Sequence, residues 1–126
     1  MLTVDANVIL RLILNDNAEM VKAARLALSK DFFFIKHEVL AEVVYVLAKM
    51  YNVSRDDISK AITGILKNRR IRVESKKTVR YAISAYQSHS LDFVDCMLYA
   101  YQIVREEEIF TFDKKLQKLL NQPNPH

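Results

Sequence analysis

Short apolar runs alternate along this sequence with longer segments whose apolar residues recur at helical spacing, and this alternation constrains the fold more than any other feature. Strands are expected over residues 2–5, 32–35, 71–73 and 109–112. Helices are expected over 7–12, 17–29, 37–51, 54–67, 76–88 and 93–105 and from 113 onward. Strands that are joined by helices pair in parallel. The pattern therefore predicts an α/β fold, a three-layer α/β/α sandwich with a short, mainly parallel sheet of four or five strands.

The length of 126 residues is sufficient for one domain with a buried core. We expect a single domain over residues 1–120, followed by a disordered tail over 121–126. No basic stretch precedes Asp5 and no apolar run is as long as a membrane span, so we expect neither a signal peptide nor a membrane association. Cys96 is the single cysteine, which excludes an intrachain disulfide and fits a reducing cytoplasm.

The charge and the glycine content narrow the classes of function. The formal net charge is +4 and the pI is about 9.2, which suits a polyanionic ligand, although many small basic proteins bind no anion. Gly64 is the single glycine. A Walker-A loop and a G-x-G-x-x-G turn each need several glycines, so nucleotide binding through these loops is excluded.

Four acids follow, or lie close to, the ends of predicted strands. Asp5 lies where the first strand ends, and Asp113 lies where the fourth ends. Glu42 lies on the helix after the second strand, and Asp95 lies near the start of the helix before the fourth. The carboxyl ends of parallel strands form the edge at which such sheets bind ligands, so we expect these acids to converge there. Clustered carboxylates repel one another unless a cation binds, and oxygen ligands favour Mg²⁺ or Mn²⁺. The sequence shows no zinc-ligand spacing.

Each acid also has a simpler explanation. Asp5 and Asp113 could cap the helices that follow them, and Glu42 could face water on an amphipathic helix. Asp92 and Asp95 lie near a helix start, where the helix dipole stabilises acids. Asp92 could be the N-cap of this helix or an accessory metal ligand. Capping or solvent exposure explains any one of these acids, but it explains less well why four of them lie at or near strand ends.

Four segments of the sequence resemble segments of a known protein family. The segment over 4–10, with Asp5 after its first strand, resembles the opening motif of PIN-domain proteins, especially toxins of the VapC type. The segments over 40–47, 91–98 and 111–113 are similar to those that carry the family's second, third and fourth acids, here Glu42, Asp95 and Asp113. The resemblance extends from Met1 to about Leu120. Cys96 stands where this family commonly has alanine.

The resemblance implies a PIN-like nuclease domain that cuts RNA, the toxin of a type II toxin–antitoxin pair. It implies one or two Mg²⁺ or Mn²⁺ ions on Asp5, Glu42, Asp95 and Asp113, where the metal would lower the pKa of a water that attacks phosphorus. It further implies a homodimer and a small antitoxin protein as partners.

Other polar residues are candidates for supporting roles. Asn7 and Thr111 could orient carboxylates or water, or could only cap the ends of elements. Arg11 could reach the RNA or an antitoxin carboxylate. The strongest candidates for phosphate contacts form one basic run, Lys67, Arg69, Arg70 and Arg72. Basic residues also favour a helix C-terminus, which is the simpler explanation for any one of them.

Two other functions remain open. One is a non-catalytic module of the same fold that binds RNA or a protein partner, against which the complete set of acids argues. The other is a phosphotransfer domain with Asp5 as nucleophile and Lys115 as phosphate ligand. That alternative lacks the expected glycine and leaves Glu42 and Asp95 without a role.

Overall fold

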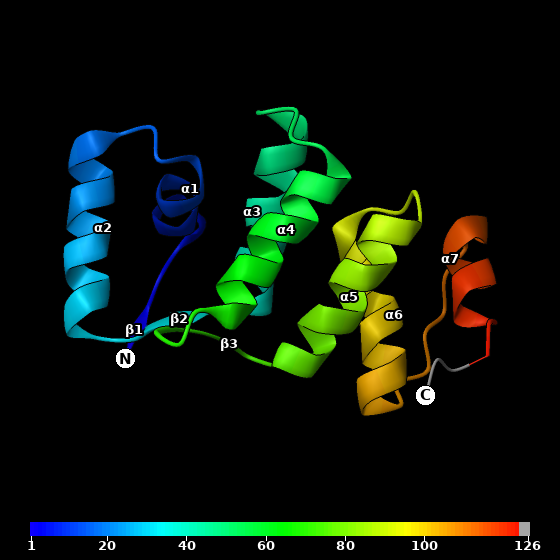
Figure 1. Ribbon diagram of the computed structural model, residues 1–126. Coiled ribbons are helices and arrows are strands. Elements are labelled where there is room, and N and C mark those ends of the chain that lie inside the picture. Colours follow the sequence, from blue (N-terminus) through cyan, green and yellow to red (C-terminus); the bar gives the residue numbers. More distant parts are fainter. Residues whose placement is uncertain (124–126) are drawn as a thin grey trace. The chain divides into compact units, whose positions relative to one another are not determined.

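The computed structural model describes residues 1–123 and divides the chain into two compact units, Met1–Glu74 and the residues from Ser75 onward (Figure 1). The first unit contains β1 (Leu2–Thr3), α1 (Ala6–Leu14), α2 (Ala18–Lys30), β2 (Phe33–Ile35), α3 (His37–Lys49), α4 (Arg55–Lys67) and β3 (Ile71–Val73). The second unit contains α5 (Lys76–Ser88), α6 (Phe93–Arg105) and α7 (Lys114–Leu120). No helix of the described chain combines the length and the apolar character that crossing a membrane requires.

The sheet of the first unit has the strand order β1-β2-β3, and both strand pairs are parallel. The predicted α/β class and the parallel sheet are therefore confirmed. Phe33 pairs with Leu2 on one side and with Ile71 on the other, and this register fixes which residues share a face. Phe33 and Ile35 are 1% and 0% exposed, so their face of the sheet forms part of the core. The opposite face carries Arg72, which is exposed.

The helices of the first unit begin and pack where the sequence pattern places them. The predicted caps Asn17 and Ser54 each accept a backbone N–H at 3.1 Å, the first from Met20 and the second from Asp57. The apolar positions at helical spacing on α3 are all buried: Leu40, Val43, Val44 and Leu47. Local signals are therefore sufficient to define these helices.

The second unit is built on α5 and α6, which pack along each other, with α7 against α6. Tyr86 of α5 and Phe93 of α6 meet edge to face, with ring centroids 5.9 Å apart. Ala82 of α5 and Ala100 of α6 are fully buried and form part of the core of this unit. Cys96 is also fully buried, in the position expected of a small core residue.

The strand predicted over 109–112 is wrong, because this segment is neither helix nor strand, and the sheet has three strands in the described chain rather than four or five. Residues 108–112 make no backbone hydrogen bond to a neighbouring strand in the described part of the chain. Phe110 and Phe112 are 83% and 88% exposed, and their rings contact each other at 5.2 Å. The apolar residues indicate strand propensity, but a strand also requires a partner.

The two ends of the described chain differ slightly from the sequence pattern. The first strand ends at Thr3 instead of continuing to Asp5. At the other end, the backbone N–H groups of Asn121 and Gln122 still bond to carbonyls of α7. The last part of the predicted tail, residues 124–126, lies outside the described residues.

Leu40 provides a test of the core of the first unit. Leu40→Ala should lower the free energy of unfolding by about 2–5 kcal/mol, because it removes a fully buried side chain and leaves a cavity. The matched control is Leu26→Ala, since Leu26 is 56% exposed and should change stability by less than about 0.5 kcal/mol. Urea unfolding measures both, and equal effects of the two substitutions would contradict the assignment of this core.

Candidate active site

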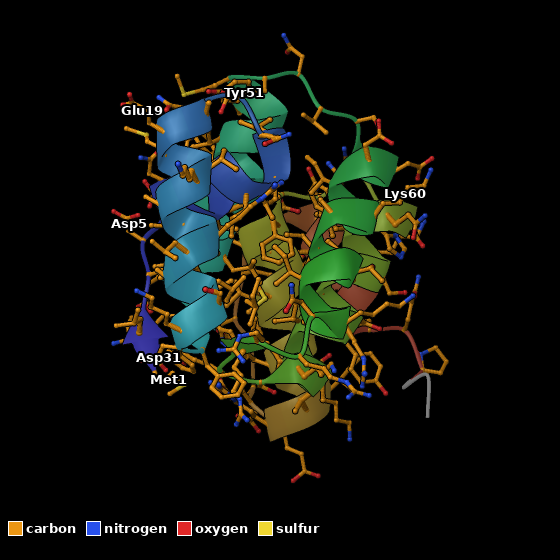
Figure 2. The ribbon with its side chains drawn as sticks, turned by 60° about the vertical axis from the view of Figure 1, so that its left-hand side comes forward. Met1, Asp5, Glu19, Asp31, Tyr51 and Lys60 are labelled. Atoms are coloured by element: carbon orange, nitrogen blue, oxygen red, sulfur yellow. The ribbon has the colours of Figure 1, made fainter. Side chains whose placement is uncertain are left out.

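The candidate acids of the first unit follow strands that end at the carboxyl edge of the sheet. The chain leaves β1, β2 and β3 at this edge because the strands are parallel. Asp5 lies two residues beyond the end of β1 and forms the N-cap of α1, where its Oδ1 accepts the N–H of Val8 at 3.1 Å. The carboxylate is exposed, and only one of its oxygens has this bond. Asp5 therefore both caps the helix and presents an oxygen to solvent (Figure 2).

Glu42 lies on α3, the helix that follows β2. Its side chain is exposed and makes no hydrogen bond or ion pair within the described chain. Glu38, one turn earlier on the same helix, is also exposed. Glu42 is therefore available as a ligand but is not fixed in position by a neighbour.

Glu74, which the sequence pattern did not single out, directly follows β3. Its Oε1 accepts the backbone N–H of His37 at 2.7 Å, so it caps α3 from another element. Lys36, the N-cap residue of α3, makes no side-chain cap bond. The signal was present in the sequence, because Glu74 directly follows a predicted strand as Asp5 and Asp113 do. Its carboxylate ties the end of β3 to the start of the helix that carries Glu42.

A pocket of about 630 Å³ opens beside Asp5 in the first unit. β1, α1 and α2 form its walls, and most of the lining is apolar, with Val4 and Ala24 among the lining residues. Asn7 lines the same pocket, and its Nδ2 donates to the sulfur of Met20 at 3.9 Å.

Arg11 is already paired inside the first unit. Its Nη1 bonds to Asp16 at 2.7 Å, and its Nη2 donates to the hydroxyl of Tyr51 at 3.4 Å. The hydrogen bond to Tyr51 and the charge of Asp16 raise the pKa of Arg11 above its usual value. An RNA phosphate or an antitoxin carboxylate at Arg11 would therefore compete with Asp16.

Asp95 of the second unit is under the influence of two other acids. Asp95 is half-buried in the first turn of α6, and its pKa is raised by burial first, then by the charges of Asp113 and Asp92. Asp92 occupies the N-cap position of α6, as one reading of the sequence expected, but its side chain makes no cap bond. The mutual repulsion of these carboxylates is a cost that a bound cation would remove.

Asp113 caps α7 in the same way as Asp5 caps α1. Its Oδ1 accepts the N–H of Leu116 at 2.9 Å, and its own N–H donates to the hydroxyl of Thr111 at 3.0 Å. Thr111 therefore fixes the backbone at Asp113 without contacting its carboxylate. Lys115 donates to the hydroxyl of Ser90 at 3.2 Å.

Neither unit by itself gathers three acidic, histidine or cysteine side chains that could hold a metal ion, among the residues that the structure describes. The donors that the chain offers are carboxylate oxygens, and they match a hard divalent cation such as Mg²⁺ or Mn²⁺ rather than zinc.

The basic run lies away from the acidic edge. Lys67 ends α4, and Arg69 and Arg70 precede β3 at the amino ends of the strands. Asp5 lies beyond the carboxyl end of β1, so it is at the opposite end of the parallel strands from Arg69 and Arg70. Figure 2 shows Met1 and Asp31 together at the amino end of β1, where the terminal ammonium and the carboxylate are 2.9 Å apart.

Comparison with known proteins defines the class. The chain matches the PIN domain family over residues 2–120 and therefore belongs to that family, as the sequence resemblance predicts. It is 31% identical over 87 residues to a VapC ribonuclease of Aquifex aeolicus (strain VF5). That similarity covers 68% of this chain and 64% of the relative, so the chain spans slightly less than two thirds of the relative's length. No solved structure matches the chain significantly.

Asp95 tests the repulsion among the acids of the second unit. Because the pKa of Asp95 is raised in the folded state, its charged form destabilises the fold at pH values above that pKa. With EDTA at pH 7, Asp95→Asn should therefore raise the free energy of unfolding by roughly 0.5 kcal/mol, a value that allows for solvent screening.

This advantage should disappear as the pH falls, because Asp95 then becomes protonated in the folded protein before it does so in the unfolded chain. Urea unfolding over a pH series measures the effect. Glu108→Gln, an exposed acid in the same unit, is the control. A variant that is no more stable than the parent at pH 7 would show that the repulsion is negligible.

Proposed function

We propose that this chain is an endoribonuclease that hydrolyses RNA phosphodiester bonds with one or two Mg²⁺ or Mn²⁺ ions held by Asp5, Glu42, Asp95 and Asp113. The single PIN-like domain would extend over residues 1–120. The observation that carries this proposal is the match to the PIN domain family over residues 2–120, a range that contains all four acids. The similarity to a VapC ribonuclease adds the substrate class.

The electrostatics of the acids support a cation at the site. Burial and the charges of Asp113 and Asp92 raise the pKa of Asp95, so the second unit concentrates negative charge around one half-buried carboxylate. When bound, a divalent cation supplies positive charge and lowers the pKa of a coordinated water. Carboxylates are suitable ligands because they bind hard cations through oxygen.

The other polar groups hold these acids in place. The cap bonds from Val8 to Asp5 and from Leu116 to Asp113 fix one oxygen of each carboxylate and leave the second oxygen for a ligand. Thr111 holds the backbone of Asp113 and acts as a positioning residue. Asp92, whose side chain makes no cap bond, is available as an accessory ligand.

The biological setting is a further part of the proposal. We assign the chain as the toxin of a type II toxin–antitoxin pair, as a homodimer that a small antitoxin protein inhibits, on the similarity to a VapC ribonuclease. The single cysteine fits a cytoplasmic location, since proteins in a reducing compartment rarely contain disulfides.

The nuclease assignment is tested by incubating purified protein with single-stranded RNA and, separately, single-stranded DNA in the presence of Mn²⁺. RNA should be cut, and either EDTA or Asp5→Asn should reduce the rate by at least about 100-fold, the scale expected when essential catalytic machinery is lost. Asn also caps helices well, so this variant should remain folded. Cleavage that persists in Asp5→Asn would reveal a contaminating nuclease or a different site.

Metal binding is tested separately by thermal unfolding. Millimolar Mn²⁺ should raise the melting temperature of the parent protein, because a ligand that binds only the folded state stabilises it. The double variant Asp5→Asn/Asp113→Asn, which keeps both caps, should lose most of this shift. A parent protein that shows neither a shift nor RNA cleavage would instead fit a non-catalytic module that binds RNA or a protein partner.

A further inference from the structure

Two arginines share one aromatic ring on the open face of the sheet. The guanidinium carbons of Arg70 and Arg72 lie 4.8 and 5.0 Å from the centroid of the Phe32 ring. The side chains of Arg70 and Arg72 point to the same side of the sheet because they are two residues apart at β3. Both cations are thus held by cation–π contact, and they are no more than about 10 Å apart.

The surrounding contacts fix this arrangement, and Asp31 offsets part of the charge of Arg70, since the pKa of Asp31 is lowered first by the terminal ammonium and also by that charge. The Nε of Arg70 donates to the carbonyl of Leu28 at 2.6 Å, which holds the guanidinium against α2. The acid in this region is Asp31, whose carboxylate already accepts the terminal ammonium at 2.9 Å and the N–H of Phe32 at 2.7 Å. Arg69 and Arg72 are exposed and make no ion pair within the described chain.

Helix dipoles explain only part of this cluster. α2 and α4 end at Lys30 and Lys67, where basic side chains are favoured, and the bond of Arg70 to a carbonyl of α2 belongs to the same effect. Arg72 lies in the middle of β3 and near no such terminus. Two like charges on one ring repel each other, and a bound anion would relieve this repulsion.

We propose that Arg69, Arg70 and Arg72, positioned by Phe32, form a docking site for the phosphate backbone of single-stranded RNA that is separate from the acidic edge. A nucleic-acid strand carries one negative phosphate per nucleotide, so successive phosphates of one strand can meet neighbouring cations of this site. Guanidinium groups bind phosphate through two parallel hydrogen bonds. The net charge of +4 favours the same ligand class.

The docking site lies at the other end of the strands from Asp5. A three-residue strand rises about 10 Å in total, and Asp5 lies beyond the carboxyl end of β1 while Arg70 precedes β3. RNA that is bound at the docking site is therefore anchored rather than cut there. This inference rests on the proposed function only in taking RNA as the ligand. Binding at the docking site does not require that the protein cuts RNA.

The test measures binding without cleavage. A fluorescently labelled single-stranded RNA is titrated with protein in the Asp5→Asn background, with EDTA and at several salt concentrations. Arg69→Gln/Arg72→Gln should weaken binding about tenfold or more at low salt. It should also reduce the slope of log K against log salt by about 1.4, because two phosphate contacts are lost on a single strand.

The matched control is Lys22→Gln/Arg25→Gln, which removes two exposed positive charges from α2 in the same unit. The control should bind RNA within about twofold of the parent. Phe32→Leu, which keeps apolar volume but removes the ring, should weaken binding with little change in the salt slope. Far-ultraviolet circular dichroism shows whether each variant is folded.

Three results would overturn the proposal. The first is an arginine variant that binds as tightly as its parent. The second is a control that loses as much affinity as the arginine variant, since net charge alone would then explain the binding. The third is an arginine variant that loses binding to a poly-glutamate peptide but not to RNA, which would assign the surface to an acidic protein. Because cleavage is absent from the assay, none of these results depends on the nuclease assignment.

Discussion

The parallel pairing of β1, β2 and β3 is the constraint on which the rest of the first unit depends. Strands this short supply few hydrogen bonds, so their stability depends on the buried side chains of Phe33 and Ile35 on the core face. Because the strands are parallel, their carboxyl ends all lie at one edge of the sheet and their amino ends at the other. Asp5 and Glu74 follow the carboxyl ends of β1 and β3, whereas Arg70 precedes the amino end of β3. The direction of the strands thereby places Asp5 and Glu74 at one end of the sheet and Arg70 at the other.

Much of the fold follows from local signals. The buried positions of α3 and the caps at Asn17 and Ser54 follow directly from spacing and residue type. The positions of Asp5 and Asp113 at the starts of helices were predictable for the same reason, because each lies directly after an apolar run. These features depend on residues within a few positions of one another, so the sequence contains the information needed to predict them.

Features that depend on distant partners were not predictable. The segment over 109–112 has the composition of a strand, but strand formation requires a neighbouring strand that composition does not specify. The bond from His37 to Glu74 joins residues that are 37 positions apart. The contacts of Arg70 and Arg72 with Phe32 likewise depend on the register of β2 and β3, which the residues of neither strand reveal alone.

The side chains of Asp5 and Asp113 cap helices, and in the proposed site they also bind metal. Replacing an N-cap acid with alanine typically costs about 1 kcal/mol of stability, whereas asparagine is nearly equivalent as a cap. If the proposed metal site is correct, most random changes at Asp5 would remove activity and weaken the fold together. A population of mutated chains would then contain few that are inert yet long-lived, because proteases remove weakly folded chains first. Selection for folding alone would thus preserve part of the catalytic apparatus, even in lineages where its activity gave no advantage.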